Sequence, residues 1–282
     1  MKITKAIIPV AGWGTRMLPI TKAIEKCMLP VGNRPVVDYI VQDVIKAGIT
    51  DIYFVVGEQS SQIQAYYGKN SLLESYLIEH GKEDKLPLVA PVDGVNFYYI
   101  TQPSNGKYGT AVPVGLCAEY IDEDESVLVL MGDDFFYDGG QTNEISRLIE
   151  ESNDGEAAML AHNIAKESVV EYGVLNIDDN GNYIGIIEKP AIEDAPSTLV
   201  NTSKYLMTKS MIDVAGAVEV NSRHGEYQIT DVINNFVELG GVMRIVEARS
   251  EYMDCGNIQG WLHANNQTGL RFSESSTTFR ET

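Results

Sequence analysis

Residues 6–16 have the sequence AIIPVAGWGTR, a short apolar run that leads directly into a turn with two glycines. Residues 6–10 are typical of a strand buried on both faces of a sheet. Gly12 and Gly14 permit backbone turns and leave free amides at the carboxyl end of that strand, where open α/β sheets bind ligands. The segment therefore predicts a strand that presents a site for a phosphate or a base.

Strand and helix patterns alternate outward from this segment. Apolar runs at residues 51–56, 96–100 and 127–131 predict three further strands. Over residues 36–45, apolar side chains recur at three- and four-residue spacing, and Gly48 follows where a helix commonly ends. A second helix is expected between residues 110 and 121. This alternation predicts an α/β fold with a mostly parallel, doubly wound sheet.

The second half of the chain has a different pattern. Strand-like runs at residues 172–177 and 183–188 flank Asn180-Gly181, a step that favours a tight hairpin turn. Further strands are expected at 199–207 and 241–248, with a helix near 229–237 between them. The sheet should therefore be mixed and continue to about residue 250. Residues 80–96 are expected to form a surface excursion, and residues 273–282 should fray unless a partner subunit holds them.

Composition and charge exclude several classes of protein. The 282 residues include 40 Asp and Glu against 21 Lys and Arg, a net charge of −19 that opposes binding to nucleic acid or an anionic membrane. Residues 1–34 nevertheless hold six lysines and arginines and one acidic residue, so a small anionic substrate can be attracted locally. Three widely spaced cysteines give no disulfide framework and fit a reducing cytoplasm. The scattered histidines give no support for zinc.

Cations follow the glycine turn closely: Arg16, Lys22 and Lys26 precede Met28-Leu29-Pro30. Met17 stands where a dinucleotide fingerprint would have its third glycine, which argues against a nicotinamide-dependent oxidoreductase. From Gly12 to Pro30 the chain resembles the bacterial UTP:glucose-1-phosphate uridylyltransferases, also called UDP-glucose pyrophosphorylases. The resemblance continues along nearly the whole chain, through segments 102–111, 132–134, 172–174, 188–190, 225–231 and 254–256.

This resemblance implies a Rossmann-like nucleotidyltransferase fold with a mixed, mostly parallel central sheet and an antiparallel sugar-binding portion. Residues 1–282 would form a single domain with a nucleotide-binding lobe at 1–140, a sugar-binding lobe at 141–250 and a C-terminal segment at 251–282 that could serve oligomerisation. It also implies the following site residues: for catalysis Arg16, Lys26 and Lys189; for the nucleotide Ala11, Gly12, Gly14, Thr15, Gln102 and Gly109; for the sugar Gly173, Glu188, Lys189 and Lys204; and for Mg²⁺ Asp133 and Asp254.

Elementary chemistry supports several of these roles and leaves simpler ones open. Asp133 ends an apolar strand, and Mg²⁺ prefers one or two carboxylates with phosphate oxygens and water as its other ligands. Either aspartate could instead cap a helix or start a turn. Gln102 offers both a donor and an acceptor to a pyrimidine edge, yet it could equally be hydrogen-bonded within a strand end. Glu188 and Lys189 could simply neutralise each other.

Three departures from the family pattern bear on substrate contacts. Glu25-Lys26-Cys27 stands where the family usually has Pro-Lys-Glu, and the loss of that glutamate puts local contacts in doubt. Lys107-Tyr108-Gly109-Thr110 replaces Gly-Leu-Gly-His. Ser203-Lys204-Tyr205 replaces Gly-Arg-Tyr, so a guanidinium becomes an ammonium without bidentate geometry.

The function implied is Mg²⁺-dependent transfer of the uridylyl group of UTP to glucose 1-phosphate, forming UDP-glucose and pyrophosphate. The expected partners are these small molecules, with no nucleic acid or membrane, and the resemblance implies a cytoplasmic homodimer or homotetramer. Two alternatives remain open: a sister nucleotidyltransferase that uses dTTP, CTP or another hexose 1-phosphate, and a non-catalytic relative that binds a nucleotide sugar.

Overall fold

The computed structural model describes residues 3–152, 156–217 and 226–275 and is built around one mixed sheet of nine strands. Seven of these strands follow the order β10-β9-β11-β6-β1-β4-β5, while β8 pairs with β11 and β12 pairs with β8. Their bounds are β1 Lys5–Pro9, β4 Asp51–Gly57, β5 Asn96–Gln102, β6 Ser126–Leu130, β8 Ala157–Asn163, β9 Gly173–Ile177, β10 Tyr183–Glu188, β11 Leu199–Thr208 and β12 Met243–Glu247. The predicted α/β class and mixed sheet are confirmed.

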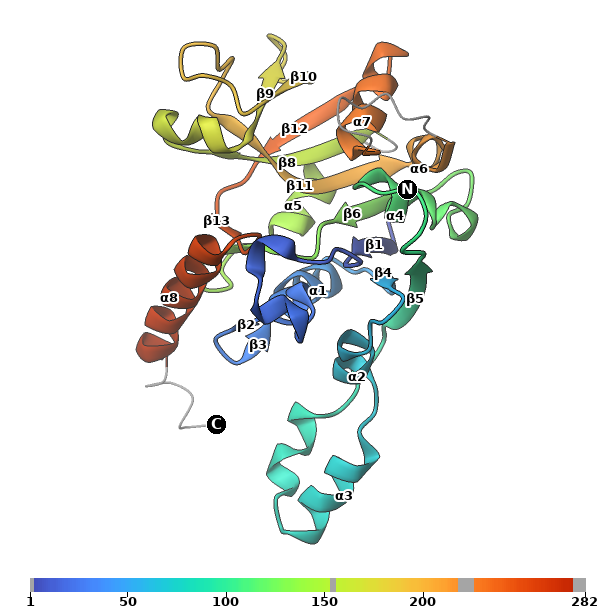
Figure 1. Ribbon diagram of the computed structural model, residues 1–282, viewed down its shortest axis with the longest axis vertical. Coiled ribbons are helices and arrows are strands. Elements are labelled where there is room, and N and C mark those ends of the chain that lie inside the picture. Colours follow the sequence, from blue (N-terminus) through green and yellow to red (C-terminus); the bar gives the residue numbers. More distant parts are fainter. Residues whose placement is uncertain (1–2, 153–155, 218–225, 276–282) are drawn as a thin grey trace.

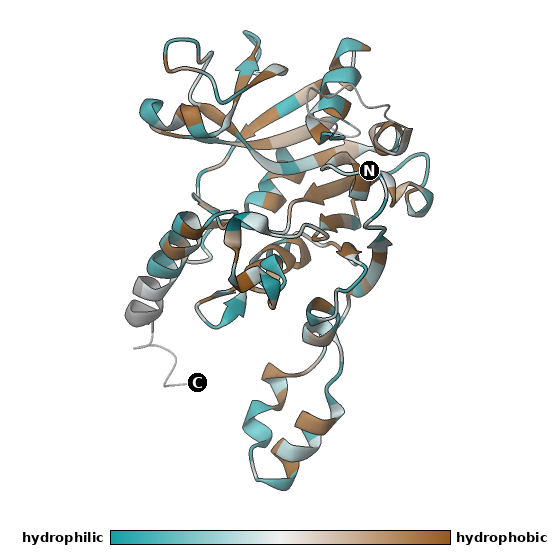
Figure 2. Cartoon of the chain, in the orientation of Figure 1, coloured by the Kyte–Doolittle hydropathy of each residue, from teal (hydrophilic) through white to brown (hydrophobic). Residues whose placement is uncertain are grey.

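The first half of the chain forms the parallel part of the sheet. β1 pairs in parallel with β4 and β6, and β4 pairs in parallel with β5. Helix α1 (Val36–Lys46) packs its apolar stripe against one face and ends just before Gly48, whose φ is +89°. The sheet separates two large apolar clusters, one containing Ile8 and the other Ile7. Figure 2 shows this apolar interior along the strands.

The helix expected between residues 110 and 121 is shorter than predicted. α4 spans Ala111–Gly115, and the chain continues as a separate 3₁₀ helix at Ala118–Tyr120. Glycine is a poor helix former. A Cβ on Gly115 would lie 2.5 Å from the backbone of Gly216, in α6 (Lys209–Ala217), so the missing side chain allows these two helices to approach closely.

The second half adds the antiparallel strands, as predicted. β9 and β10 form a hairpin around Asn180-Gly181, and Gly181 adopts a φ of +80°. β11 is the strand that joins the two halves, because it pairs antiparallel with β8 along one edge and with β9 and then β6 along the other (Figure 1). Helix α7 (Ile229–Glu238) buries Ile229, Val232 and Ile233 in the second apolar cluster.

A short two-stranded ribbon lies outside the main sheet and was not predicted. β7 (Asp134–Tyr137) pairs antiparallel with β13 (Glu251–Asp254), with Asp254 opposite Asp134. Helix α5 (Glu144–Glu151) secures this ribbon, because the buried carboxylate of Glu144 accepts hydrogen bonds from the backbone amides of Arg249 and Ser250 at 2.8 and 2.7 Å. The ribbon brings Glu251–Asp254 back to the end of β6.

Two segments project from this body in Figure 1. One contains α2 (Gln62–Tyr67), α3 (Ser71–Glu79) and a 3₁₀ helix at Glu83–Leu88, so the predicted surface excursion at 80–96 is confirmed. The other is α8 (Ile258–Ser275). The fraying expected at 273–282 falls mostly outside the described residues. Within the described part of the chain, no helix combines the length and apolar character needed to cross a membrane.

Candidate functional site

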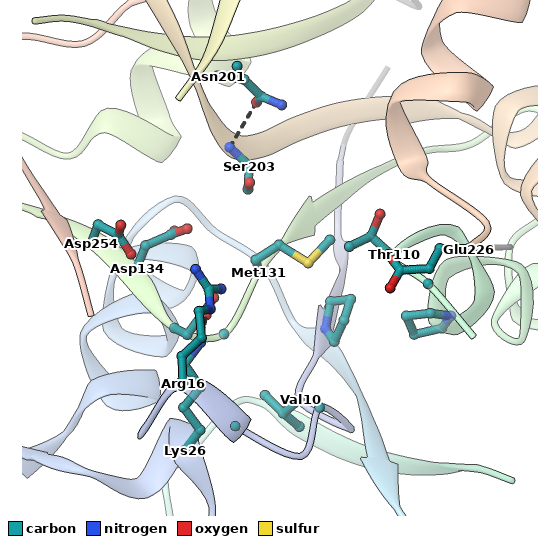
Figure 3. Close-up of a pocket in the computed structure, with 18 of the residues that line it drawn as sticks. Val10, Arg16, Lys26, Thr110, Met131, Asp134, Asn201, Ser203, Glu226 and Asp254 are labelled. Atoms are coloured by element: carbon teal, nitrogen blue, oxygen red, sulfur yellow. Dashed lines mark hydrogen bonds and ion pairs between the residues drawn. The ribbon is translucent and has the colours of Figure 1, made fainter. Parts of the chain in front are cut away.

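A pocket of about 600 Å³ opens at the carboxyl ends of β1, β5 and β6 and is closed on its other side by the antiparallel strands. Figure 3 shows side chains from both parts of the sheet converging on it. Thirteen of the fourteen predicted site residues line this pocket: Ala11, Gly12, Gly14, Thr15, Arg16, Lys26, Gln102, Gly109, Asp133, Gly173, Glu188, Lys189 and Asp254. The exception is Lys204.

The glycine turn after β1 forms one wall. A Cβ on Gly12 would meet no protein atom within 4 Å, so its surface is open for a ligand to approach. Gly14 has a φ of +63°, and a Cβ there would lie 2.9 Å from Thr21 and 3.1 Å from Lys26. Thr21 Oγ1 donates to the Gly14 carbonyl at 2.9 Å. The turn thus packs against the segment that carries Lys26, while Arg16 follows in the 3₁₀ helix Thr15–Met17.

Glu25 fixes the backbone beside Lys26. Its carboxylate accepts hydrogen bonds from Ser60 Oγ at 2.7 Å, Ser61 N at 2.9 Å and Gln62 N at 2.8 Å, at the start of α2. Gln62 Oε1 accepts from Glu25 N at 3.0 Å in return. Glu25 does not line the pocket, whereas the small, buried Cys27 does. The departure at 25–27 therefore replaces a side chain in the pocket wall and adds an anchor behind it.

Asp133 and Asp254 come together at Gly256. Asp133 follows β6 and Asp254 ends β13, and a Cβ on Gly256 would lie 2.7 Å from Asp254 Oδ1 and 3.5 Å from Asp133 Oδ2. The ammonium of Lys26 lies 3.5 Å from the same point and pairs with Asp133 Oδ2. Burial raises the pKa of Asp133, but Lys26, and less strongly Lys204, outweigh burial and hold that pKa below its ordinary value.

This donor set fits a hard divalent cation that also takes ligands from its substrate. Two carboxylates face a space kept free by a glycine, and an ammonium already occupies its edge. No group of three or more His, Cys, Asp or Glu side chains within the described residues is arranged to hold a metal. A cation held by Asp133 and Asp254 would therefore need phosphate oxygens and water to complete its coordination, as Mg²⁺ commonly does.

The far end of the pocket is shaped by a close approach at Gly109. Its φ is +128°, and a Cβ there would lie 2.3 Å from the Tyr227 carbonyl oxygen. Tyr227 N donates to Tyr108 O at 2.8 Å and Ala111 N donates to Tyr227 O at 2.9 Å, so two backbone hydrogen bonds join Tyr227 to the segment around Gly109. This contact brings Glu226 into the pocket, beside Thr110 (Figure 3). Gly225, the first residue of the motif at 225–231, lies outside the described residues.

Gly173 and Glu188 face each other across the β9–β10 hairpin. They are register partners, and a Cβ on Gly173 would lie 2.8 Å from Glu188 Oε2. The missing side chain therefore leaves room for that carboxylate. Lys189 follows with a φ of +47°, a conformation in which a non-glycine residue is uncommon, and its amide donates to Tyr172 O at 3.0 Å.

Asn201 and Ser203 also line the pocket, and sequence reasoning missed both. The pairing of β11 with β8 is irregular between Asn201 and Tyr205, and Ser203 has a φ of +56°. Ser203 N donates to Asn201 Oδ1 at 2.9 Å, as Figure 3 shows. The signal was present in the motif, because Ser203 stands where the resembling family has glycine, the residue that best tolerates this φ.

Lys204 lies beneath the pocket rather than in its wall. The residue is 1% exposed, its ammonium pairs with Asp134 Oδ1, and Tyr252 OH donates to Asp134 Oδ2 at 3.1 Å. Burial lowers the pKa of Lys204, and the carboxylates of Asp133 and Asp254 limit that shift. The position does not fit the predicted sugar contact, because β11 is covered on both faces and turns this side chain toward the aspartates.

Comparisons with known proteins show which family the chain resembles. The family model described as nucleotidyl transferase matches residues 5–269. A Methanocaldococcus jannaschii protein provisionally named as a UTP–glucose-1-phosphate uridylyltransferase is 36% identical over 286 residues, which cover 99% of this chain and 96% of the relative. The Bacillus subtilis UTP–glucose-1-phosphate uridylyltransferase YngB is 30% identical over 95% of this chain and 90% of its own.

A solved structure is similar over the whole fold. The UTP-bound UGPase from Acinetobacter baumannii superimposes with a TM-score of 0.87 and 27% sequence identity, covering 99% of this chain and 98% of that one. The likeness includes both the parallel and the antiparallel parts of the sheet.

Proposed function

Because the chain belongs to the nucleotidyl transferase family, we propose that it transfers the uridylyl group of UTP to glucose 1-phosphate, forming UDP-glucose and pyrophosphate. One observation carries the proposal: a single pocket is lined by a cationic glycine turn, by two aspartates and by a Glu-Lys pair. These groups match the chemistry of a triphosphate, a divalent cation and a sugar phosphate.

The nucleotide occupies the side of the parallel strands in this proposal. The open backbone at Ala11, Gly12 and Thr15 receives the nucleotide, and Gln102 and Gly109 border the uracil. Gln102 has both a donor and an acceptor for the pyrimidine edge. Arg16 and Lys26 hold the triphosphate, where positive charge stabilises the pyrophosphate as it departs.

The sugar phosphate occupies the side of the antiparallel strands. Glu188 accepts hydrogen bonds from sugar hydroxyls above Gly173, and Lys189 neutralises the sugar phosphate. This orients a phosphate oxygen for in-line attack on the α-phosphorus, opposite the departing pyrophosphate. When bound by Asp133 and Asp254, Mg²⁺ supplies further charge neutralisation at the phosphates. The chain needs no covalent nucleophile for this reaction.

The test is pyrophosphate release by the purified protein with glucose 1-phosphate. UTP is run beside dTTP, CTP, ATP and GTP, each with and without Mg²⁺. We expect Mg²⁺-dependent release with UTP far above the others. Preference for another nucleotide, or for another hexose phosphate in place of glucose 1-phosphate, would replace the proposal with a sister nucleotidyltransferase. Tight UDP-glucose binding without turnover would indicate a non-catalytic binding protein.

Three further expectations stay part of the proposal. The reaction is placed in the cytoplasm, in keeping with three cysteines that are all free. Lobes at 1–140 and 141–250 would bind nucleotide and sugar respectively. A homodimer or homotetramer formed through residues 251–282 is carried by the family resemblance and can be tested by light scattering on a chain truncated after Asp254.

A further inference from the structure

Asp133 and Asp134 each pair with a lysine, but the two pairs differ in their access to the pocket. In the Lys204–Asp134 pair, the side chains are 2% and 7% exposed. In the Lys26–Asp133 pair, they are 13% and 29% exposed, and both residues line the pocket, whereas Asp134 is the only member of the first pair that does. The first pair is almost fully buried, whereas the second is more accessible to a ligand.

The Lys26 ammonium lies at the edge of the space that the two metal-binding aspartates surround. Measured from the Cβ position of Gly256, Lys26 Nζ and Asp133 Oδ2 are both 3.5 Å away, and Asp254 Oδ1 is 2.7 Å away. A divalent cation at these carboxylates would share Asp133 Oδ2 with the ammonium and would be repelled by it. The two cations therefore compete for one carboxylate oxygen.

The Lys26 backbone is held, whereas its side chain reaches the pocket and pairs there with Asp133. Glu25 is anchored at the start of α2, and Lys26 begins the 3₁₀ helix Lys26–Met28. Beyond this anchored backbone, a lysine has a flexible four-carbon stem that ends in a compact charge. Rotation about this stem would let the ammonium exchange Asp133 for a bound phosphate.

We infer that Lys26 is a built-in counter-ion of Asp133 that an incoming divalent cation displaces, so that the cation enters together with the triphosphate rather than before it. The inference rests on the proposed roles of Asp133, Asp254 and Lys26. In the ligand-free protein Lys26 neutralises Asp133 and keeps the cation affinity low. With nucleotide bound, the phosphates draw the ammonium away and supply oxygen ligands, so nucleotide and cation each strengthen the binding of the other.

The experiment measures Mn²⁺ binding to the nucleotide-free protein by electron paramagnetic resonance. Lys26→Gln should bind Mn²⁺ about tenfold more tightly than wild type, because the cation no longer has to displace an ammonium from the Asp133 carboxylate. Lys26→Arg keeps the charge and should bind as weakly as wild type. Lys22→Gln removes an exposed charge from the same loop and should change the affinity less than twofold. Equal or weaker Mn²⁺ binding by Lys26→Gln would overturn the inference.

A second measurement uses the preformed Mn²⁺–UTP complex, and here Lys26→Gln should change the affinity in the opposite direction. Lys26→Gln should bind this complex several-fold more weakly than wild type, because the phosphates lose their lysine. A purely structural role for Lys26 would shift both measurements in the same direction, and that result would contradict the inference. Thermal melting confirms that each variant is folded.

Asp133→Asn in the Lys26→Gln background separates this inference from the proposed function. Loss of the gained Mn²⁺ binding supports exchange at Asp133, whereas retained binding means that the cation lies elsewhere and overturns the exchange. Neither measurement requires turnover. If the protein released no pyrophosphate from UTP, the proposed reaction would be wrong, but the Mn²⁺ measurements would still test the exchange at Asp133.

Discussion

Asp133 and Asp134 are neighbours in the chain, yet they belong to two different regions of the molecule. Asp133 lines the pocket with Lys26, whereas Asp134, which also borders the pocket, is buried at the start of β7 and is held by Lys204 and Tyr252. Asp133 lies in the turn between β6 and β7, whereas Asp134 is the first residue of β7, so the two carboxylates reach different partners. Identical chemistry can therefore serve a reaction on one side and stability on the other.

The surroundings determine what each pair contributes. A partly exposed ion pair typically adds little to the stability of a fold. A buried charge that loses its partner is strongly destabilising, because nothing else solvates it. The pocket pair can be broken and remade by ligands, whereas the core pair should stay intact throughout the reaction.

The largest expected effect is that of Lys26→Ala on turnover. We expect pyrophosphate release to fall by roughly 10²–10³-fold, the size seen when one charge-stabilising donor is lost. The melting temperature should change little, because the pair with Asp133 is open to the pocket. Lys22→Ala serves as the control for a nearby exposed charge. A folded Lys26→Ala protein with wild-type turnover would show that the Lys26–Asp133 pair does not serve the reaction.

Lys204→Met should instead act on stability. We expect a loss of about 3–5 kcal/mol in urea unfolding, because Asp134 is left buried and uncompensated. The double variant Lys204→Met/Asp134→Leu should recover most of that loss, since it removes both charges. If the single variant lost under 1 kcal/mol, Lys204 would not be the counter-charge that Asp134 requires.

Glu25→Ala should lower both stability and turnover, each by a smaller amount than the two variants above. Three hydrogen bonds to residues 60–62 are lost, so we expect about 1–2 kcal/mol of destabilisation. Turnover should also fall, by roughly tenfold, because a misplaced catalytic group slows the reaction. Glu25→Gln retains an acceptor and should be milder in both assays. Unchanged turnover in Glu25→Ala would show that Lys26 does not depend on this anchor.

The smallest effect concerns Asp43, a carboxylate on α1 whose pKa burial raises to about 7, with Lys46 opposing that rise. An unfolded aspartate has a pKa of about 3.9, so the folded protein holds this proton more tightly. Asp43 therefore contributes stability below about pH 4 that is lost as the pH rises toward 7 and above. In urea unfolding, the free energy of unfolding should fall less between pH 4 and pH 8 in Asp43→Asn than in wild type, by about 1 kcal/mol. The same pH dependence in variant and wild type would contradict it.

Much of the site followed from local patterns in the sequence. The segment Gly12–Pro30 and the short motifs at 132–134, 188–190 and 254–256 are contiguous, and each lies at the end of a strand. The burial of Lys204 beneath the pocket was not foreseen, because β11 is buried on both faces and its pairing shifts near Ser203. Alternation alone cannot orient a side chain in such a strand.

Other features depend on contacts between distant segments. Glu25 acquires its role only when it meets residues 60–62, and Gly109 adopts its φ only against Tyr227. β7 and β13 are four residues each, too short for a reliable pattern, and they pair across more than a hundred residues. Their register nevertheless determines how Asp254 reaches Asp133.

The pairing of β11 with β6 also has a consequence for the synthesis of the protein on the ribosome. β6 ends at Leu130, but the strand that covers its open edge begins only at Leu199. At typical synthesis rates of about 5–20 residues per second, that edge waits on the order of several seconds for its neighbour. An apolar strand with an unpaired edge can associate with other chains during this interval. Nascent chains of this protein should therefore need protection from one another until the second half emerges.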